Sequence, residues 1–482
     1  MNYALIQKTI GMMILVFAVI LIIPISISII YNDGNTSSFI YSFTIIFLFG
    51  SLLFFPNQSN SFDSSIKIKE GFLIVVLFWV LLSFLGSFPF MFDINLSMSF
   101  ADAFFESVSG WTTTGATIIS NLDDLSPSIL IYRQLLQWLG GMGIVVLALA
   151  VLPMLGVGGM QLYKAESGGP IKDNKISPRI AETAQNLWKV YLGLTLLCAA
   201  AYYLAGMNIF DAIAHSFSTI AIGGFSTHNQ SIAYFNSFEI ELVCMIFMFL
   251  SALNFILHFH SLKSRSLKIY FKDVEFRLYI LLIVVFSFLL LLYTSFFYAN
   301  EISVMGILFQ VISFITTSGF VSMSYDDWPV SIISILIFLS FLGACAGSTG
   351  GGIKIIRILF ILKELKRGLI KIIHPSAEVP IKINDQAVNE NISNNILLFF
   401  IFYIISYIFL SLILLLMGLD ATTAFSSVAA CLNNLGPGAG SVIDNYSSIN
   451  TATKYLLSFT MLLGRLEIYT LLIIMTPYFW KY

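Results

Sequence analysis

Apolar residues run along this chain in blocks of about 20, separated by short polar stretches. A helix of that length can cross the hydrocarbon core of a bilayer. The blocks lack the alternation of a membrane β-strand, so the sequence predicts an all-α polytopic membrane protein. The ten predicted spans cover roughly 10–31, 38–55, 71–92, 128–153, 187–206, 239–258, 278–298, 328–362, 395–418 and 454–480.

Composition supports this interpretation. Of the 482 residues, 58% are hydrophobic and only 10% are charged, whereas about 25% of the residues of a soluble domain carry a charge. The mean hydropathy is +0.89. The net charge of −2 excludes a nucleic-acid binder, which would need a basic face. The four cysteines are scattered through apolar blocks, so we expect no disulfide framework and no zinc site.

Basic residues give the chain an orientation. They concentrate in three loops, at 164–189, 263–277 and 363–382, and near both chain ends. If ten spans alternate, these regions share one side of the membrane, and the opposite side carries only Arg133 and Lys454. Loops rich in lysine and arginine remain cytoplasmic. Both termini are therefore expected in the cytoplasm.

Four segments between the spans are too short to cross, and each ends at a glycine. They cover about 101–114, 210–222, 303–317 and 421–433. The turns that follow are Thr113-Thr114-Gly115, Ile222-Gly223-Gly224, Thr317-Ser318-Gly319 and Asn434-Leu435-Gly436. Their glycines are 109, 95 and 117 residues apart, which is an internal repeat. The predicted unit is span, half-helix, glycine turn, span, repeated four times after two extra spans.

Four such copies can close around one axis and form a pore. Irregular backbone at membrane depth is tolerated only where it is buried or lines a water-filled path. Carbonyls of the turns can replace the hydration shell of an ion, and glycine permits φ values that a Cβ resists. The half-helix C-termini carry partial negative charge, which favours a cation. Close helix packing is the alternative role for these glycines.

Polar residues recur at matching places in the copies. Asp102 and Asp211 each precede their glycine by 13 residues, where we expect the N-cap of the half-helix. Glu106 and His215 follow four residues later and are expected to form hydrogen bonds behind the turns. Asp420 stands just before the fourth half-helix.

A glycine-rich stretch interrupts the block at 328–362. Residues 347–352 contain four glycines, which a helix does not tolerate well. The stretch is expected inside the membrane beneath the turns. A passive hinge is one alternative. A phosphate-binding loop is another, because Ser348, Thr349 and Lys354 resemble one in composition, although their spacing does not.

Arg465 and Glu467 interrupt the last block. An arginine near the bilayer centre costs about 2.5–3.5 kcal/mol on insertion scales, so it should face the pore or a carboxylate. As a fixed cation beneath the turns, Arg465 would slow the passage of ions. The alternative is a structural ion pair with Glu467 or Glu106.

Together these motifs resemble the superfamily of bacterial Trk/Ktr and plant HKT potassium transporters, and within it the membrane subunits of the Trk uptake system. The resemblance covers essentially the whole chain, and the two extra N-terminal spans favour the Trk type. It rests on the four turns, on residues 347–354 (GSTGGGIK), on residues 464–467 (GRLE) and on residues 170–182 (PIKDNKISPRIAE).

The resemblance implies a potassium-selective uptake pathway. In the family, serine at the first filter glycine accompanies sodium permeation, so Gly115 favours potassium. The implied potassium-binding filter consists of Thr113, Thr114, Gly115, Ile222, Gly223, Gly224, Thr317, Ser318, Gly319, Asn434, Leu435 and Gly436. The implied gate consists of Gly347, Ser348, Thr349, Gly350, Gly351, Gly352, Lys354 and Arg465.

The resemblance also implies partners. We expect a homodimer in the bacterial inner membrane, with a TrkA-type cytoplasmic regulatory subunit that binds a nucleotide such as ATP, ADP or NADH. The chain itself is expected to bind potassium and no other cofactor. The expected domains are an N-terminal extension and four pore repeats, with a gating loop at 344–354 in the third. Their boundaries are 1–60, 61–165, 166–268, 269–385 and 386–482.

Two other functions compete with gated conduction. A proton- or sodium-coupled potassium symporter could use the same fold, but coupling would need a titratable group on the path, and the turns carry none. An intramembrane enzyme would need a catalytic constellation, and the sequence contains no recognisable one. We therefore expect a transporter rather than an enzyme.

Overall fold

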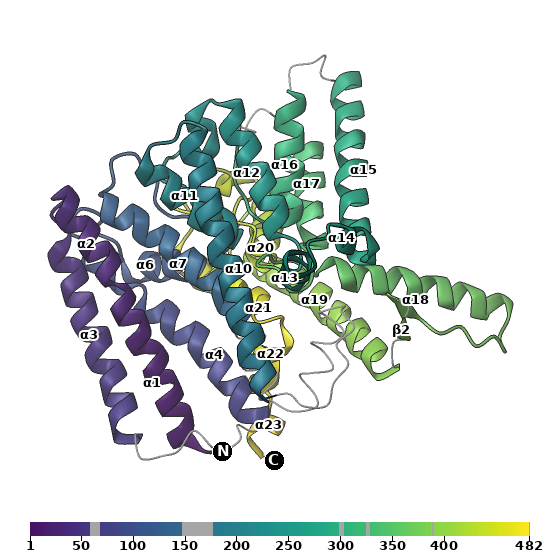
Figure 1. Cartoon of the computed structure of the whole chain (residues 1–482), viewed down its shortest axis with the longest axis horizontal. Helices are drawn as coiled ribbons and strands as arrows, with labels where there is room; N and C mark the ends of the chain where they lie inside the picture. Colours follow the sequence, from purple (N-terminus) through teal and green to yellow (C-terminus); the bar gives the residue numbers. More distant parts are fainter. Residues whose placement is uncertain are drawn as a thin grey trace.

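The computed structural model describes residues 1–57, 68–146, 177–297, 303–323, 328–384, 386–387 and 390–481. These residues form a helical molecule, as predicted (Figure 1). Its strands are two short segments, β1 (Lys382–Ile383) and β2 (Gln386–Ala387), which pair in an antiparallel hairpin. Short 3-10 turns lie at Phe55–Asn57, Ser231–Phe235 and Gly440–Val442.

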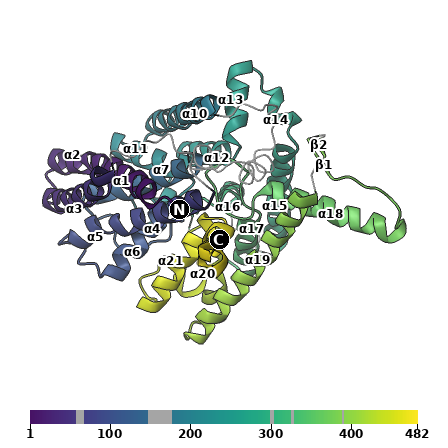
Figure 2. The same cartoon turned by 90° about the horizontal axis from the view of Figure 1, so that it is seen from below.

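The helices form an N-terminal group and four repeats of similar order (Figures 1 and 2). The N-terminal group contains α1 (Tyr3–Ile20), α2 (Ile22–Tyr31) and α3 (Thr36–Phe54). The first repeat contains α4 (Ile68–Leu85), α5 (Phe88–Phe92), α6 (Phe100–Trp111) and α7 (Pro127–Val146). The second contains α10 (Ser177–Leu204), α11 (Ile209–Ala221), α12 (Phe238–Ser251) and α13 (Phe255–Ser264), and the third contains α14 (Lys268–Lys272), α15 (Val274–Phe297), α16 (Val304–Thr316), α17 (Val330–Leu342) and α18 (Ile355–Ile373). The fourth contains α19 (Glu390–Leu416), α20 (Ala421–Leu432), α21 (Thr451–Arg465), α22 (Tyr469–Met475) and α23 (Pro477–Lys481).

Six described helices, or eight when each bent pair counts as one span, are long and apolar enough to cross a membrane. The total of ten spans stays a prediction. Two predicted continuous spans are wrong in detail, because α12 and α13 meet at 95° and α21 and α22 at 114°. The first bend lies where Asn254 caps α13. The second lies where Glu467 and Ile468 adopt positive φ, which ends a right-handed helix.

The four short helices α6, α11, α16 and α20 lie where the repeat predicts half-helices. Their N-caps correct the expectation for two aspartates. Ser99 and Asn208 are the N-caps, and their side chains accept hydrogen bonds from the backbone N–H of Asp102 and Asp211. The aspartates occupy the third helical position, where a carboxylate still interacts favourably with the helix dipole. Asp420 is the N-cap of α20.

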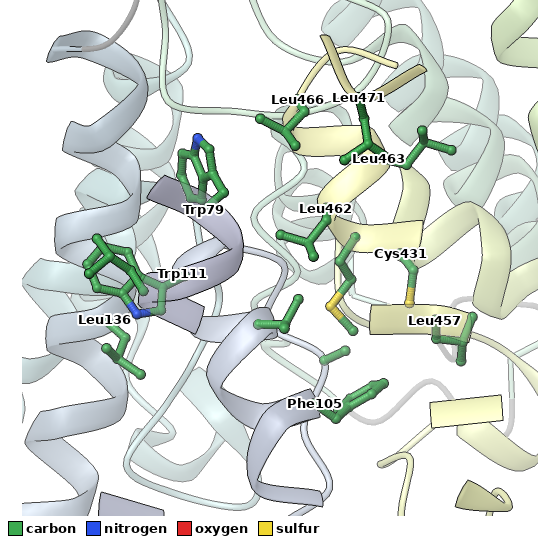
Figure 3. Close-up of a cluster of buried hydrophobic side chains, with 14 of the residues drawn as sticks. Trp79, Phe105, Trp111, Leu136, Cys431, Leu457, Leu462, Leu463, Leu466 and Leu471 are labelled. Carbon is green, nitrogen blue, oxygen red and sulfur yellow. The ribbon is translucent and has the colours of Figure 1, made fainter. Parts of the chain in front are cut away.

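The first and last repeats meet in one buried apolar cluster. Trp79, Phe105 and Trp111 come from α4 and α6, and they face Leu457 and Leu462 of α21 across it (Figure 3). Residues nearly 400 positions apart therefore share a core. The chain closes on itself, as four repeats around one axis require.

The outward faces of the long helices are apolar. Large hydrophobic side chains of α3, α15 and α19 are exposed, including Leu52, Phe288 and Ile405. A water-soluble protein rarely exposes such continuous apolar surface, whereas lipid tails cover it without cost. The exposed faces therefore agree with an integral membrane protein.

Candidate functional site

The four short helices end in the same way. A residue one or two positions beyond the C-terminus of each adopts a positive φ, at Thr113 (53°), Ile222 (55°), Thr317 (65°) and Asn434 (54°). The next N–H then donates back to the helix, in the pairs Thr114–Ser109 (2.9 Å), Gly223–Ser218 (2.9 Å), Ser318–Ser313 (2.8 Å) and Leu435–Ala430 (2.8 Å). This is the Schellman motif. Left-handed backbone is strained at the β-branched residues Thr113, Ile222 and Thr317, whereas asparagine at position 434 tolerates it more easily.

The glycine that follows also has a positive φ in every copy. A Cβ added there would collide with the carbonyl oxygen of the next copy. A Cβ at Gly115 would lie 2.2 Å from Gly223 O, and one at Gly224 would lie 2.0 Å from Ser318 O. A Cβ at Gly319 would lie 2.1 Å from Leu435 O, and one at Gly436 would lie 2.6 Å from Thr114 O. Each turn therefore abuts the next, and the fourth returns to the first. We call residues 113–115, 222–224, 317–319 and 434–436 the ring.

A buried ion pair joins the first two ring segments from behind. Arg133, fully buried on α7, donates from Nε to Glu106 Oε1 at 2.8 Å. Its other nitrogens donate to Ser226 O at 3.0 Å and Thr117 Oγ1 at 3.1 Å. Glu106 also accepts from the backbone N–H of Ile118 at 2.9 Å. We call the Glu106–Arg133 pair the clamp, because it ties the extended segment after Gly115 to the extended segment after Gly224.

The other copies place smaller polar groups behind the ring. His215 contacts Asp211 O and Ser226 Oγ, each at 2.9 Å. Ser313 donates to Phe320 O at 2.7 Å, and Ser426 donates to Ala439 O at 3.0 Å. The prediction that Glu106 and His215 form hydrogen bonds behind the turns is therefore correct.

Polar side chains of neighbouring elements also hold the ring. Gln137 of α7 donates to Gly223 O at 2.6 Å and accepts from the N–H of Phe225 at 3.1 Å. Asn434 donates to Thr114 Oγ1 at 3.0 Å, which joins the fourth segment to the first. Sequence reasoning missed the clamp and Gln137. The sequence did contain a signal for them. Arg133 and Gln137 are polar residues inside a predicted apolar span, and such residues must find a hydrogen-bonding partner.

Residues 343–354, which we call the glycine loop, separate α17 from α18 as predicted. The loop contacts the ends of three half-helices. Thr349 Oγ1 donates to Ile220 O at 3.0 Å, Gly351 N donates to Thr317 Oγ1 at 2.7 Å, and Gly352 N donates to Asn433 O at 3.1 Å. Ser348 bonds within the loop to Cys345 O, and Lys354 Nζ donates to Gly350 O. The loop therefore lies across the C-terminal ends of α11, α16 and α20.

The glycines of this loop are needed for close contact. A Cβ on Gly351 would lie 2.0 Å from Asn433 O, and one on Gly350 would lie 2.6 Å from Thr316 O. Gly347 has a positive φ of 72° and accepts a backbone hydrogen bond from Phe255 at 3.1 Å. A passive hinge would not need such contacts with three repeats.

Arg465 lies at the loop and is 4% exposed. It donates to Thr349 O at 3.0 Å and to Gly140 O at 3.1 Å, so it connects the loop to α7. The alternative of an ion pair with Glu467 or Glu106 is wrong. Glu467 pairs with Arg357 at 2.7 Å, and Glu106 belongs to the clamp. Within the described part of the chain, Arg465 is thus held by carbonyl oxygens, and no ion pair with a carboxylate accompanies these hydrogen bonds.

A histidine links two repeats on the side of the ring away from the loop. His228 Nδ1 lies 2.7 Å from Asp123 Oδ1, and its Nε2 lies 3.3 Å from Asp211 Oδ2. Its ring stacks on Tyr234 at 3.5 Å between centroids. Burial lowers the pKa of His228, but the hydrogen bonds and charges of Asp211 and Asp123 outweigh burial, so the pKa is raised above its usual value.

The described residues contain no group of three or more His, Cys, Asp or Glu side chains that could hold a metal ion. An ion at the ring would have to rely on backbone and hydroxyl oxygens. Of the sequence motif at 170–182, residues 170–176 lie outside the described part of the chain, and so do the side chains of the rest.

Comparison with known proteins gives concordant matches. A profile of the TrkH family, described as cation transport protein, matches residues 35–482. The chain is 47% identical to the Trk system potassium uptake protein TrkH of Escherichia coli (strain K12), with all of both chains covered. It is 37% identical to the TrkG protein of the same organism, covering 98% of this chain and 97% of TrkG. The crystal structure of the potassium transporter TrkH from Vibrio parahaemolyticus matches with a TM-score of 0.92 and 44% identity, covering all of both chains.

Proposed function

The chain belongs to the TrkH family of cation transport proteins, and from this premise we propose that it takes up potassium through one central pore at the ring. Its relatives are named potassium uptake proteins of the Trk system. The observation that carries the proposal is the closed cycle of four turns, in which each glycine abuts a carbonyl oxygen of the next copy.

The selectivity filter in this proposal consists of the twelve ring residues. Positive φ recurs at the first and third residue of every turn. This alternation turns successive carbonyl groups toward one side, where they can replace the water around a potassium ion. The half-helix C-termini add negative potential at the centre of the ring.

The gate in this proposal consists of the glycine loop and Arg465. The loop crosses the C-terminal ends of three half-helices, and a cation leaving the ring would meet it. Arg465 does not deprotonate in proteins, and its repulsion of a cation is stronger in a narrow, low-dielectric passage than in water. The loop must therefore move before potassium passes. Deletion of residues 350–352 is expected to raise the resting flux.

The assembly in this proposal follows the Trk system that the relatives' names describe. The chain would work as a homodimer in the bacterial inner membrane, with both termini in the cytoplasm. A TrkA-type nucleotide-binding subunit would dock on the cytoplasmic face and move the loop. The five segments bounded at residues 60, 165, 268 and 385 would be the N-terminal extension and the four pore repeats.

The test is ion flux into liposomes that contain the purified chain. Replacing Gly115 by serine is expected to raise sodium permeation relative to potassium, because the Cβ of the new side chain would lie 2.2 Å from Gly223 O and displace the ring. Gly193 is the matched control, since a Cβ there meets nothing within 4 Å. An unchanged permeability ratio in a folded Gly115→Ser protein would contradict the proposal.

The same assay separates conduction from coupled symport. Potassium flux through a pore follows the potassium gradient and the membrane potential alone. A symporter would accumulate potassium when only a proton or sodium gradient is imposed.

A further inference from the structure

One buried carboxylate joins both arms of the glycine loop. Glu275, in the first turn of α15, is 4% exposed. Its Oε1 accepts from the backbone N–H of Ala346 at 2.8 Å and from that of Ile356 at 3.1 Å. Ala346 lies near the start of the loop, and Ile356 lies in the first turn of α18, just beyond the end of the loop. A single side chain thus fixes the distance between the two ends of the loop.

The bond to Ile356 fills a vacant capping position. Lys354 is the N-cap of α18, but its side chain makes no capping hydrogen bond and points instead to Gly350 O. The N-terminal N–H groups of a helix need acceptors. Glu275 supplies one from another helix, and its carboxyl oxygen lies at the positive end of the α18 dipole, where an acceptor is favoured. The start of α18 and the loop therefore depend on the same carboxylate.

Glu275 is in turn connected to the β1–β2 hairpin. Asn384, in the hairpin turn, accepts from the N–H of Val274 at 3.1 Å and donates to Asp273 Oδ2 at 3.0 Å. Ile383 packs on the apolar cluster that contains Ala346 and Ile356. The hairpin thus touches the residues on both sides of the Glu275 carboxylate.

The geometry points to Glu275 as the latch of the glycine loop, a positioning residue that holds the loop across the ring and whose own place is set by the hairpin through Asn384. This inference rests on the proposed function of the loop as the gate. Anything that displaces the hairpin would shift the start of α15 and weaken both hydrogen bonds at once. The loop would then be free to leave the path.

The experiment measures loop position separately from transport. Cys345 lies in the loop and is 2% exposed. In a protein with Cys198, Cys244 and Cys431 replaced by alanine, modification of Cys345 by N-ethylmaleimide reports loop movement. Potassium flux into liposomes and thermal stability are measured on the same samples, after the cysteine background itself is shown to transport normally.

Glu275→Ala is expected to increase both the labelling rate of Cys345 and the resting flux by at least about tenfold, because two buried backbone N–H groups lose their acceptor. Glu275→Gln keeps an oxygen acceptor for these N–H groups, so a smaller increase of about threefold is expected. Glu241→Ala is the matched control. Glu241 is also in the first turn of its helix, α12. The carbonyl of Ala252, which accepts a hydrogen bond from the loop, lies at the other end of that helix, so Glu241 is remote from the loop contact.

Unchanged protection of Cys345 in folded Glu275→Ala protein would overturn the latch. If Glu275→Ala does not fold, the Glu275→Gln protein decides. Labelling of Cys345 in Glu275→Gln at the wild-type rate would overturn the latch equally. Faster labelling without faster flux would support the latch and contradict the proposed gate. The two ideas can therefore fail separately.

Discussion

The ring and the glycine loop lie next to each other but are held in different ways. The ring repeats one backbone arrangement four times, with a Schellman turn and a glycine contact in every copy. Among the described residues, the loop occurs in the third repeat and has no counterpart in the other copies. It is held by single contacts, some from side chains such as Glu275 and Arg465 and some from backbone groups such as Asn433 O. A structure fixed by the same backbone contacts in four copies suits ion selection. A loop held by single, unrepeated hydrogen bonds can be released.

The largest effect on transport is expected from a ring glycine. In Gly224→Ala, the added Cβ would lie 2.0 Å from Ser318 O at a positive φ of 75°. Overpacking and left-handed strain together should lower the free energy of unfolding by about 2–5 kcal/mol and abolish selective flux. Thermal denaturation and flux of Gly224→Ala and Gly193→Ala would be compared. Wild-type selectivity in Gly224→Ala would show that the ring tolerates change.

The clamp offers a sharper test of how the ring is held. Among the described residues, this ion pair connects the first two copies and no others. Glu106→Gln leaves the Arg133 charge buried without a carboxylate, which should cost about 3–5 kcal/mol. The double variant Glu106→Gln with Arg133→Met removes both charges and should recover part of this loss. Thermal stability of the two single variants and the double variant measures the coupling. Additive losses would mean that the pair does not act as a unit.

Much of this arrangement follows from the sequence. Glycines at near-regular spacing predicted the four half-helices, and the run at 347–352 predicted the loop, because both depend on local backbone chemistry. The partners of Arg465 and Arg133 could not be predicted. Their side chains contact residues that are distant in sequence, and several acidic residues were equally plausible partners. The break at Asn254 was missed for a related reason, since the glycine loop that packs there comes from another repeat.

The smallest effect is expected at His228, outside the ring and the loop. Its raised pKa means that protonated His228 stabilises the fold. This contribution, about 0.2–1 kcal/mol for a screened ion pair, is complete below the unfolded pKa of about 6.5. It is lost as the pH rises through the folded pKa. His228→Gln should therefore reduce the fall in thermal stability between about pH 6 and about pH 9 relative to the unsubstituted protein. Equal pH profiles of thermal stability for the two proteins would exclude this role.

The most direct test of the account is the potassium-to-sodium permeability ratio of Arg465→Ala, measured together with its potassium flux. Arg465 connects the loop to α7 and contacts no ring residue among its hydrogen bonds. Removing it should release the loop and the repulsive charge and leave the ring intact. The account predicts faster potassium flux at an unchanged permeability ratio. Unchanged flux in a stable protein, or a ratio that falls as in Gly115→Ser, would contradict the division between a fixed ring and a releasable loop.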